Sequence, residues 1–212
     1  MDRLTPGEEI APPTEPASRV DGRRQRSART RQAIVEAYLA LLRYKPRLPT
    51  AEQVARKATL SERAVFAHFP DMPALGIAAF DYVMAVRPLT PVGDEINAGR
   101  EARIEFQVRL RANTCETWLP LWRGVMVAQC GSPEVERRVN VVHELMRRRL
   151  QVMYSAELDC LTSTDRVATL NALEGVLSFD SWGRLREHYK LSYDAACKAW
   201  IRTIDRLLPP TP

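Results

Sequence analysis

Apolar residues recur along this chain at intervals of three and four, the spacing that places them on one face of an α-helix. The first clear stripe precedes Tyr44, where the helix is expected to end because Pro46 and Pro49 follow. This stripe consists of Ile34, Tyr38, Leu41 and Leu42. No stretch of convincing length alternates between apolar and polar residues as a half-buried strand does, and no segment repeats. The pattern therefore predicts an all-α protein with about nine helices.

Two short helices are predicted immediately after these prolines. Thr50 and Gln53 have the spacing of a capping box, in which each side chain bonds the backbone N–H of the other residue. A three-residue turn, 58–60, leads to Ser61, which is placed to cap the next helix. The side chains expected to face inward are Val54, Ala55, Leu60, Val65, Phe66 and Phe69. The side chains left on the outer face are Glu62, Arg63, Ala67 and His68.

The rest of the chain is predicted to be helical, apart from a loop rich in Pro, Gly and Asp around residues 87–99. Ser132 is expected to cap a helix whose first residue is Pro133, a favourable position for proline. The final helix carries one of the cleanest apolar stripes of the chain. The predicted helices lie near residues 73–85, 100–118, 120–130, 133–156, 165–187 and 192–208.

Positive charge is concentrated near the N-terminus. The whole chain carries +5, but residues 19–72 hold twelve Lys and Arg against five Asp and Glu, so the remainder is slightly acidic. Six arginines fall within thirteen residues: Arg19, Arg23, Arg24, Arg26, Arg29 and Arg31. A run of this kind also occurs as a merely solvated tail. We expect a flexible basic arm that attracts a polyanion, preceded by a disordered, proline-rich leader over residues 1–18.

Other features of the sequence argue against several classes of protein. The four cysteines, Cys115, Cys130, Cys160 and Cys197, are too widely spaced for a metal knuckle or a redox pair and are expected to be reduced thiols. Neither a signal peptide nor an apolar run of ~20 residues occurs, so we expect a soluble, cytoplasmic protein without membrane contact. The sequence contains no glycine-rich phosphate loop, nucleophile–base pair or ligand cluster, so no enzyme activity, cofactor or metal is expected.

A longer helix followed by two short helices with a three-residue turn is the arrangement of a helix-turn-helix, whose recognition helix enters the major groove of DNA. Segment 51–75, AEQVARKATLSERAVFAHFPDMPAL, resembles the helix-turn-helix signature of TetR-family transcriptional regulators. The matching residues are Ala55, Ala58, Ser61, Val65, Phe66, His68, Phe69, Ala74 and Leu75. The sequence departs from the family at Thr59, where glycine is usual. Beyond this segment the resemblance extends to size, helix count and the C-terminal helices.

The resemblance implies a DNA-binding transcriptional regulator, most often a repressor, that binds a palindromic double-stranded operator as a homodimer. It also implies control by a small apolar or amphipathic ligand in the C-terminal domain. The predicted DNA contacts are Arg23, Arg24, Arg26, Arg29, Thr50, Ser61, Glu62, Arg63, Ala67 and His68. Arg63 is long enough to reach a guanine edge, although an ion pair with Glu62 or Asp71 is an alternative role for it.

The expected domains are the leader over residues 1–18, a basic arm and helix-turn-helix DNA-binding domain over 19–72, and a helical-bundle ligand-binding and dimerisation domain over 73–212. Candidate ligand-pocket residues are Phe106, Trp118, Trp122, Met126, Phe179 and Trp182, although large apolar residues at helical spacing more often form a core. Candidate dimer contacts are Leu170, Leu173, Leu177, Trp182, Tyr193, Cys197, Trp200, Ile201 and Ile204. Two alternative functions are a helical enzyme or protein-interaction adaptor with a basic N-terminal arm, and a regulator that acts without a ligand.

Overall fold

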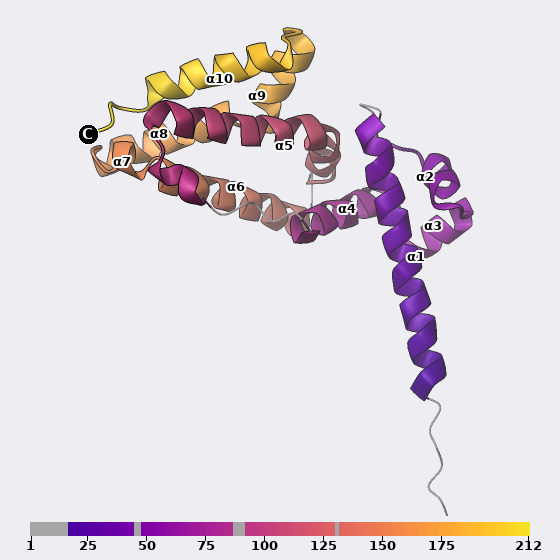
Figure 1. Ribbon diagram of the computed structural model, residues 1–212. Helices are drawn as coiled ribbons and strands as arrows, with labels where there is room; N and C mark the ends of the chain where they lie inside the picture. Colours follow the sequence, from indigo (N-terminus) through magenta and orange to yellow (C-terminus); the bar gives the residue numbers. More distant parts are fainter. Residues whose placement is uncertain (1–16, 45–47, 87–91, 130–131) are drawn as a thin grey trace, which may run out of the picture.

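The computed structural model describes residues 17–44, 48–86, 92–129 and 132–212 (Figure 1). These residues contain helices and their connections and no strand, which confirms the predicted all-α class. The α-helices are α1 (Ala17–Tyr44), α2 (Ala51–Ala58), α3 (Glu62–His68), α4 (Met72–Val86), α5 (Arg100–Gln129), α6 (Pro133–Met153), α7 (Ser155–Leu158), α8 (Ser163–Val176), α9 (Phe179–Gly183) and α10 (Tyr193–Leu207). A 3-10 turn, η1 (Asp94–Asn97), precedes α5, and a π-helical turn, η2 (Arg184–His188), follows α9.

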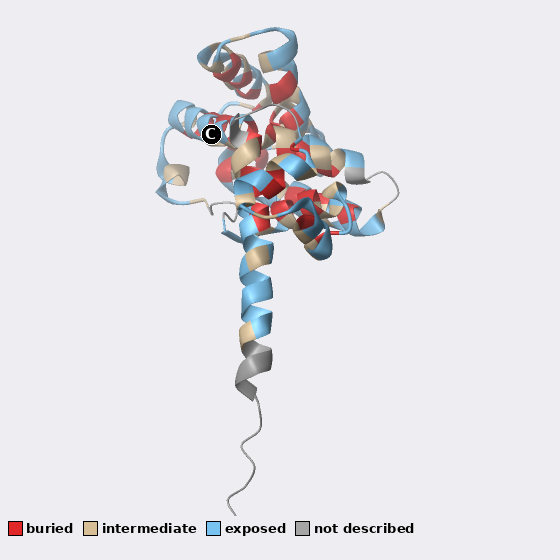
Figure 2. Cartoon of the chain, turned by 90° about the vertical axis from the view of Figure 1, so that its right-hand side faces the viewer, coloured by how far each residue is buried: buried red, intermediate tan, exposed pale blue. Residues whose placement is uncertain are grey.

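The helix α1 divides into a packed half and an exposed half. Its C-terminal half buries the predicted apolar stripe against α2 and α4, with Ile34, Tyr38 and Leu42 in the core. None of the residues 22–33 is buried, and this half projects away from the body (Figure 2). The expectation of a flexible arm is therefore wrong from Ala17 onward, because those residues are helical. The expected leader otherwise lies outside the described residues.

Local capping rules account for most helix starts. The Thr50 hydroxyl accepts from the backbone N–H of Gln53, and the Gln53 side chain accepts from the backbone N–H of Thr50, so the predicted capping box is confirmed. The Ser61 hydroxyl likewise accepts from the backbone N–H of Ala64 at the start of α3. Ser132 occupies the cap position of α6 but makes no side-chain capping bond, which corrects that expectation. Pro133 is the first residue of α6, as predicted.

Two predicted helix boundaries are wrong. Separate helices were expected near 100–118 and 120–130, but α5 continues through Pro120 over thirty residues. Burial of Leu119, Leu121 and Trp122 on both sides of the proline explains this, because packing contributes more than the one hydrogen bond that proline removes. Conversely, the helix predicted over 165–187 is interrupted, because Ser178 caps a new helix by accepting from the backbone N–H of Ser181.

The C-terminal body is built around α5. This helix runs between α10 on one side and α6 on the other, and α8 packs on both α6 and α10 (Figure 1). Aromatic side chains fill the space beside α9: the rings of Trp182 and Trp200 lie 4.8 Å apart, and Trp200 donates its indole N–H to the Ser181 hydroxyl. The chain end is held as well, because Arg100 donates to the backbone carbonyls of Asp205, Leu208 and Pro209.

The helix α4 joins the N-terminal helices to this body. It packs against α1 through one part of its surface and against α5 through another. Close to α1, a Cβ atom on Gly76 would lie 3.4 Å from the Tyr38 hydroxyl, so the end of the Tyr38 side chain packs against α4. A second contact joins the same parts, since Leu48 lies against Gly124 of α5. The helix α4 is thus in contact both with α5 of the C-terminal body and with α1, which packs against α2.

Candidate nucleic-acid interface and ligand cavity

The inward side of α3 fixes the orientation of its outer side. Val65 and Phe69, four residues apart, are both buried. The guanidinium carbon of Arg31 lies 4.6 Å from the centre of the Phe69 ring, so a cation–π contact ties α3 to α1. Val54 and Ala55 of α2 are buried on the same core, as predicted. The angle between α2 and α3 is therefore set by packed side chains.

The outer face of α3 is available to a partner. Glu62, Arg63 and Ala67 are exposed, and His68 is partly exposed. Arg63 makes no ion pair with any residue that the structure describes, so the alternative pairing with Glu62 or Asp71 is absent from it. The Asp71 carboxylate instead accepts from the backbone N–H of Ala74. An unpaired guanidinium on an exposed helix face is a strong donor for phosphate or for a guanine edge.

The two capping hydroxyls lie at the N-terminal ends of α2 and α3. Each acts as an acceptor in its cap, so its own O–H remains a potential donor to phosphate. The backbone N–H of Thr50 is not free for this role, because it donates to Gln53. A phosphate bound at Thr50 would therefore have to accept from the hydroxyl and not from the backbone N–H.

The exposed N-terminal half of α1 carries several positively charged side chains. Arg23, Arg24, Arg26 and Arg29 are all exposed along the projecting helix (Figure 2). Arg26 donates to the carbonyl of Gly22 within the same helix. No described acidic residue forms an ion pair with any of the four. This surface is suited to phosphate groups.

Phe66 is a candidate contact that sequence reasoning missed. It was expected to face inward, but 46% of it is exposed, beside Arg63 on α3. The residue lies one position from Val65 and three from Phe69, and a short helix has room to bury only the face that those two share. An exposed phenyl ring on a recognition helix can contact a thymine methyl group.

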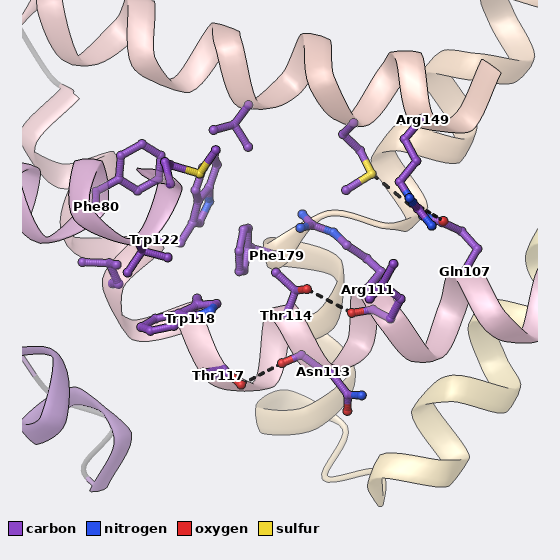
Figure 3. Close-up of a pocket in the computed structure, with 16 residues that line it drawn as sticks. Phe80, Gln107, Arg111, Asn113, Thr114, Thr117, Trp118, Trp122, Arg149 and Phe179 are labelled. Carbon is purple, nitrogen blue, oxygen red and sulfur yellow. Dashed lines mark hydrogen bonds between the residues drawn. The ribbon is translucent and has the colours of Figure 1, made fainter. Parts of the chain in front are cut away.

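A cavity of about 280 Å³ lies in the C-terminal body among α4, α5, α6 and α9 (Figure 3). Trp118, Trp122 and Phe179, three of the predicted pocket residues, lie in its wall. The Trp122 and Phe179 rings stack with their centres 4.8 Å apart. The other three predicted residues are absent from the wall: Phe106 is exposed on α5, Met126 is partly buried elsewhere, and Trp182 is packed in the core. Periodicity could not separate core from cavity wall.

The polar side chains of the cavity wall were not predicted. Arg111, Gln107 and Arg149 lie there, and all three are buried. The Arg149 guanidinium donates to the Gln107 side chain at 2.9 Å and pairs with Glu95 at 3.2 Å. Figure 3 shows the aromatic residues toward one end of the cavity and the Gln107–Arg149 pair toward the other. These residues come from three separate segments, so only the folded chain reveals their proximity.

Comparison with known proteins relates this geometry to a fold. No protein-family model matches the sequence, and no curated protein matches it. A solved structure from Mesorhizobium loti, of a protein assigned to the TetR family of transcriptional regulators, superposes with a TM-score of 0.51 and 19% identity, covering 86% of this chain and 96% of that one. This chain has the TetR-family fold. Native NalD of Pseudomonas aeruginosa, the secondary repressor of the MexAB-OprM multidrug efflux pump, superposes with a TM-score of 0.46 and 19% identity. This match also covers 86% of this chain and 96% of that one.

Thr59 lies in the turn between the two short helices of this TetR-like fold. Thr59 ends α2 with φ 58° and ψ 42°, in the left-handed region that glycine adopts without strain. Its backbone N–H bonds the carbonyls of Ala55 and Arg56, which fixes the turn into α3. A β-branched residue at such a position is strained. The departure from glycine noted in the sequence therefore has a conformational cost.

The candidate dimer residues are mostly inside this TetR-like subunit. Within one chain the buried ones are Leu170, Leu173, Leu177, Trp182, Cys197, Trp200 and Ile204. Tyr193 and Ile201 are partly exposed. A side chain already buried in its own subunit has little surface left for a second copy. The apolar pattern of α8 and α10 thus reports the core of the subunit.

An ionised network braces α5 against α9 and η2. Glu116 accepts from the indole N–H of Trp182 at 2.8 Å and from Nε and Nη2 of the Arg186 guanidinium. The hydrogen bond from Arg186 is the main cause that lowers the pKa of Glu116.

Burial raises the pKa of the Cys115 thiol to about 11, so this cysteine is not a thiolate. Within the described ranges no cluster of His, Cys, Asp and Glu is placed to hold a metal ion.

His143 and Glu144 point in different directions. His143 contacts Glu174 on α8, with Nδ1 and Oε1 2.6 Å apart, while Glu144 pairs with Arg148 along α6.

Cys130 lies outside the described residues, and Cys160 is exposed. Over the part of the chain that is described, no helix has both the length and the apolar composition needed to cross a bilayer.

Proposed function

We propose that this protein is a DNA-binding transcriptional regulator whose α3 enters the major groove. The observation that carries this proposal is Arg63, exposed on the outer face of α3 and without an ion-pair partner among the described residues, in a TetR-like fold. Arg63 is the proposed base contact, because a guanidinium can bond both acceptors of a guanine edge. Glu62, Ala67 and His68 are proposed neighbours of that contact, and Thr50 and Ser61 are proposed to bond phosphate.

The basic half of α1 is proposed to strengthen binding without reading sequence. Each arginine that neutralises a phosphate releases condensed counterions, which steepens the fall of affinity with salt. Arg23, Arg24, Arg26 and Arg29 are the proposed contributors. The unit over residues 19–72 is therefore the proposed DNA-binding domain, and residues 73–212 are the proposed regulatory and dimerisation domain.

We propose a homodimer, because two copies of one reading helix match a palindromic operator. The outward sides of α8 and α10 are the proposed contact. Val167 is exposed on α8 and Ile201 is partly exposed on α10, although each helix buries its main stripe internally. Sedimentation of the pair of variants Val167→Glu and Ile201→Glu tests this, since a charge in each helix face would release monomers. Unchanged sedimentation of both would place the interface elsewhere.

We propose that a small molecule relieves repression. The helix α4 would transmit the effect of binding, because it contacts both the cavity and α1. Phe80, Val83 and Met84 of α4 line the cavity, while Tyr82 of the same helix bonds Glu36 of α1. A ligand that favours one position of α4 would favour one spacing of the two reading helices in a dimer. Operator affinity then changes by a shift of population. No catalytic role is proposed.

Selection of bound duplexes from a random pool tests the proposal directly. We expect a palindromic motif for the wild type. Arg63→Ala should weaken binding by about 1–3 kcal/mol and relax preference at one base pair of each half-site. Arg148→Ala, an exposed arginine on α6, is the matched control and should leave the motif unchanged. Recovery of no motif, or equal effects of both variants, would contradict the proposal.

A further inference from the structure

Three arginines are buried among the described residues, and two of them face carboxylates. Arg103 bonds Glu157, which is itself fully buried. Arg149 pairs with Glu95 at 3.2 Å. Arg111 is the exception, because it forms no ion pair with any acidic residue that the structure describes. A buried charge without a counter-charge is unfavourable, so its position calls for a functional explanation.

Two contacts with described residues hold the Arg111 guanidinium. Its Nε donates to the carbonyl of Leu177 at 2.7 Å. Its central carbon lies 4.5 Å from the centre of the Phe179 ring. Only 7% of the residue is exposed, and it belongs to the cavity wall. Its two terminal nitrogens donate to no described residue, and Figure 3 shows the guanidinium between Phe179 and the Gln107–Arg149 pair, pointing away from that pair.

The rest of the cavity wall does not neutralise this charge. The wall contains two arginines and no aspartate or glutamate. The hydroxyls of Thr114 and Thr117 donate to the carbonyls of Leu110 and Asn113 on their own helix. The remaining wall is mainly aromatic and aliphatic, with Trp118 and the stacked Trp122 and Phe179 near one end. The cavity therefore offers a cation beside a flat apolar surface.

We propose that the cavity binds an aromatic carboxylate, with Arg111 as its counter-ion and the Trp122–Phe179 end around its ring. The two free amino groups of a guanidinium form a planar fork that matches the two oxygens of a carboxylate. A volume of about 280 Å³ accommodates one small ring system. The inference rests on the proposed function only for the role of the cavity, since it identifies the chemical class of the ligand that would control DNA binding.

Calorimetric titration with matched pairs of small molecules tests this inference. The probes are benzoate and 2-naphthoate, each compared with its neutral amide, benzamide and 2-naphthamide. Acid and amide have nearly the same shape, so a difference in affinity reports the charge. For the wild-type protein we expect at least one acid to bind about tenfold or more tightly than its amide, the factor that corresponds to about 1.4 kcal/mol.

Variants of Arg111 assign the preference to this side chain. Arg111→Gln should abolish the preference for the acid, and Arg111→Lys, which keeps the charge without the fork, should retain part of it. Arg109→Gln is the matched control, because Arg109 is an exposed arginine two positions away on α5. Circular dichroism of each variant establishes that it is folded. If Arg111→Gln does not fold, the comparison of Arg111→Lys with the wild type decides.

Several results would overturn the inference. These are no binding of either acid, equal binding of acids and amides, or an acid preference that persists in Arg111→Gln. The titrations contain no DNA, so their outcome is independent of the proposed function. Acid binding by a protein that selects no duplex would contradict the DNA-binding role alone, and duplex selection without acid binding would contradict the ligand class alone.

Discussion

The hydroxyl of Tyr82 on α4 donates a hydrogen bond to the carboxylate of Glu36 on α1, across 3.1 Å. Glu36 also accepts from Gln32 of its own helix at 2.8 Å. The residue after Tyr82 is Val83, which lines the cavity. One turn of α4 thus contacts both α1, which packs against α2, and the cavity proposed to bind a ligand.

Replacing Tyr82 by phenylalanine should lower the free energy of unfolding by about 0.5–1.5 kcal/mol, the usual contribution of one hydrogen bond. Urea denaturation measures this change. Tyr189→Phe is the control, because Tyr189 is exposed and its hydroxyl makes no hydrogen bond to any described residue. If both variants have the same stability as the wild type, the contact between α4 and α1 does not depend on this bond.

Replacing Thr59 by glycine should stabilise the protein. The left-handed conformation disfavours a side chain by about 1–2 kcal/mol, and the greater freedom of glycine in the unfolded chain offsets about 0.5–1 kcal/mol of this. A net gain of up to about 1.5 kcal/mol is expected in urea or thermal unfolding. Lys57→Gly, in the last turn of α2, should instead destabilise by about 1 kcal/mol. A loss of stability at both positions would argue against strain at Thr59.

Replacing Glu116 by glutamine should destabilise the protein at neutral pH and much less in acid. The pKa of Glu116 is lowered in the folded state, chiefly by the hydrogen bond from Arg186. A lowered carboxyl pKa contributes stability above the ordinary value of 4.5, and this contribution is lost as the pH falls through the lowered value. Melting temperatures of wild type and variant should therefore converge as the pH falls below the ordinary value.

Glu105→Gln serves as the comparison for this pH dependence. Glu105 also pairs with an arginine, Arg109, but the pair is exposed along one helix face. Such pairs contribute little to stability. A pH-dependent difference of equal size in Glu105→Gln would show that the position of Glu116 beside Trp182 has no special effect.

Replacing Gly183 by valine should destabilise the protein by about 1–3 kcal/mol through overpacking. A Cβ atom at this position would lie 2.8 Å from the Arg123 side chain and 3.3 Å from Leu119, where α9 meets α5. Arg123 would have to leave its two hydrogen bonds to Glu187. Gly175→Val on α8 is the control, since no atom lies within 4 Å of a Cβ there. Thermal unfolding of both variants distinguishes crowding from a general effect of valine.

Local signals were the reliable part of the sequence. The capping box of Thr50 and Gln53 involves residues three apart and a fixed geometry, so its spacing sufficed to locate α2. The continuation of α5 through Pro120 depends on packing against distant helices, which no window around the proline contains. Residues close together in the chain were therefore enough to predict that a segment is helical, but they predicted only some of the helix ends.

Side-chain environments were harder to predict than helices. The aromatic end of the cavity was anticipated through Trp118, Trp122 and Phe179 because large apolar residues are the usual lining. Arg111 was missed, since an arginine within an amphipathic helix normally faces solvent and only the fold buries it. The apolar stripes of α8 and α10 were assigned to a dimer contact, yet a stripe cannot distinguish a partner subunit from the chain's own core.

The exposed half of α1 has a consequence for how the molecule behaves in solution. No residue from 22 to 33 is buried, so this stretch is stabilised mainly by its own backbone bonds. Five of its side chains are arginines, whose mutual repulsion opposes coiling and weakens as salt is added. Added salt therefore favours the helix over the coil at this end, and the shape of the protein depends on the ionic strength of the solution.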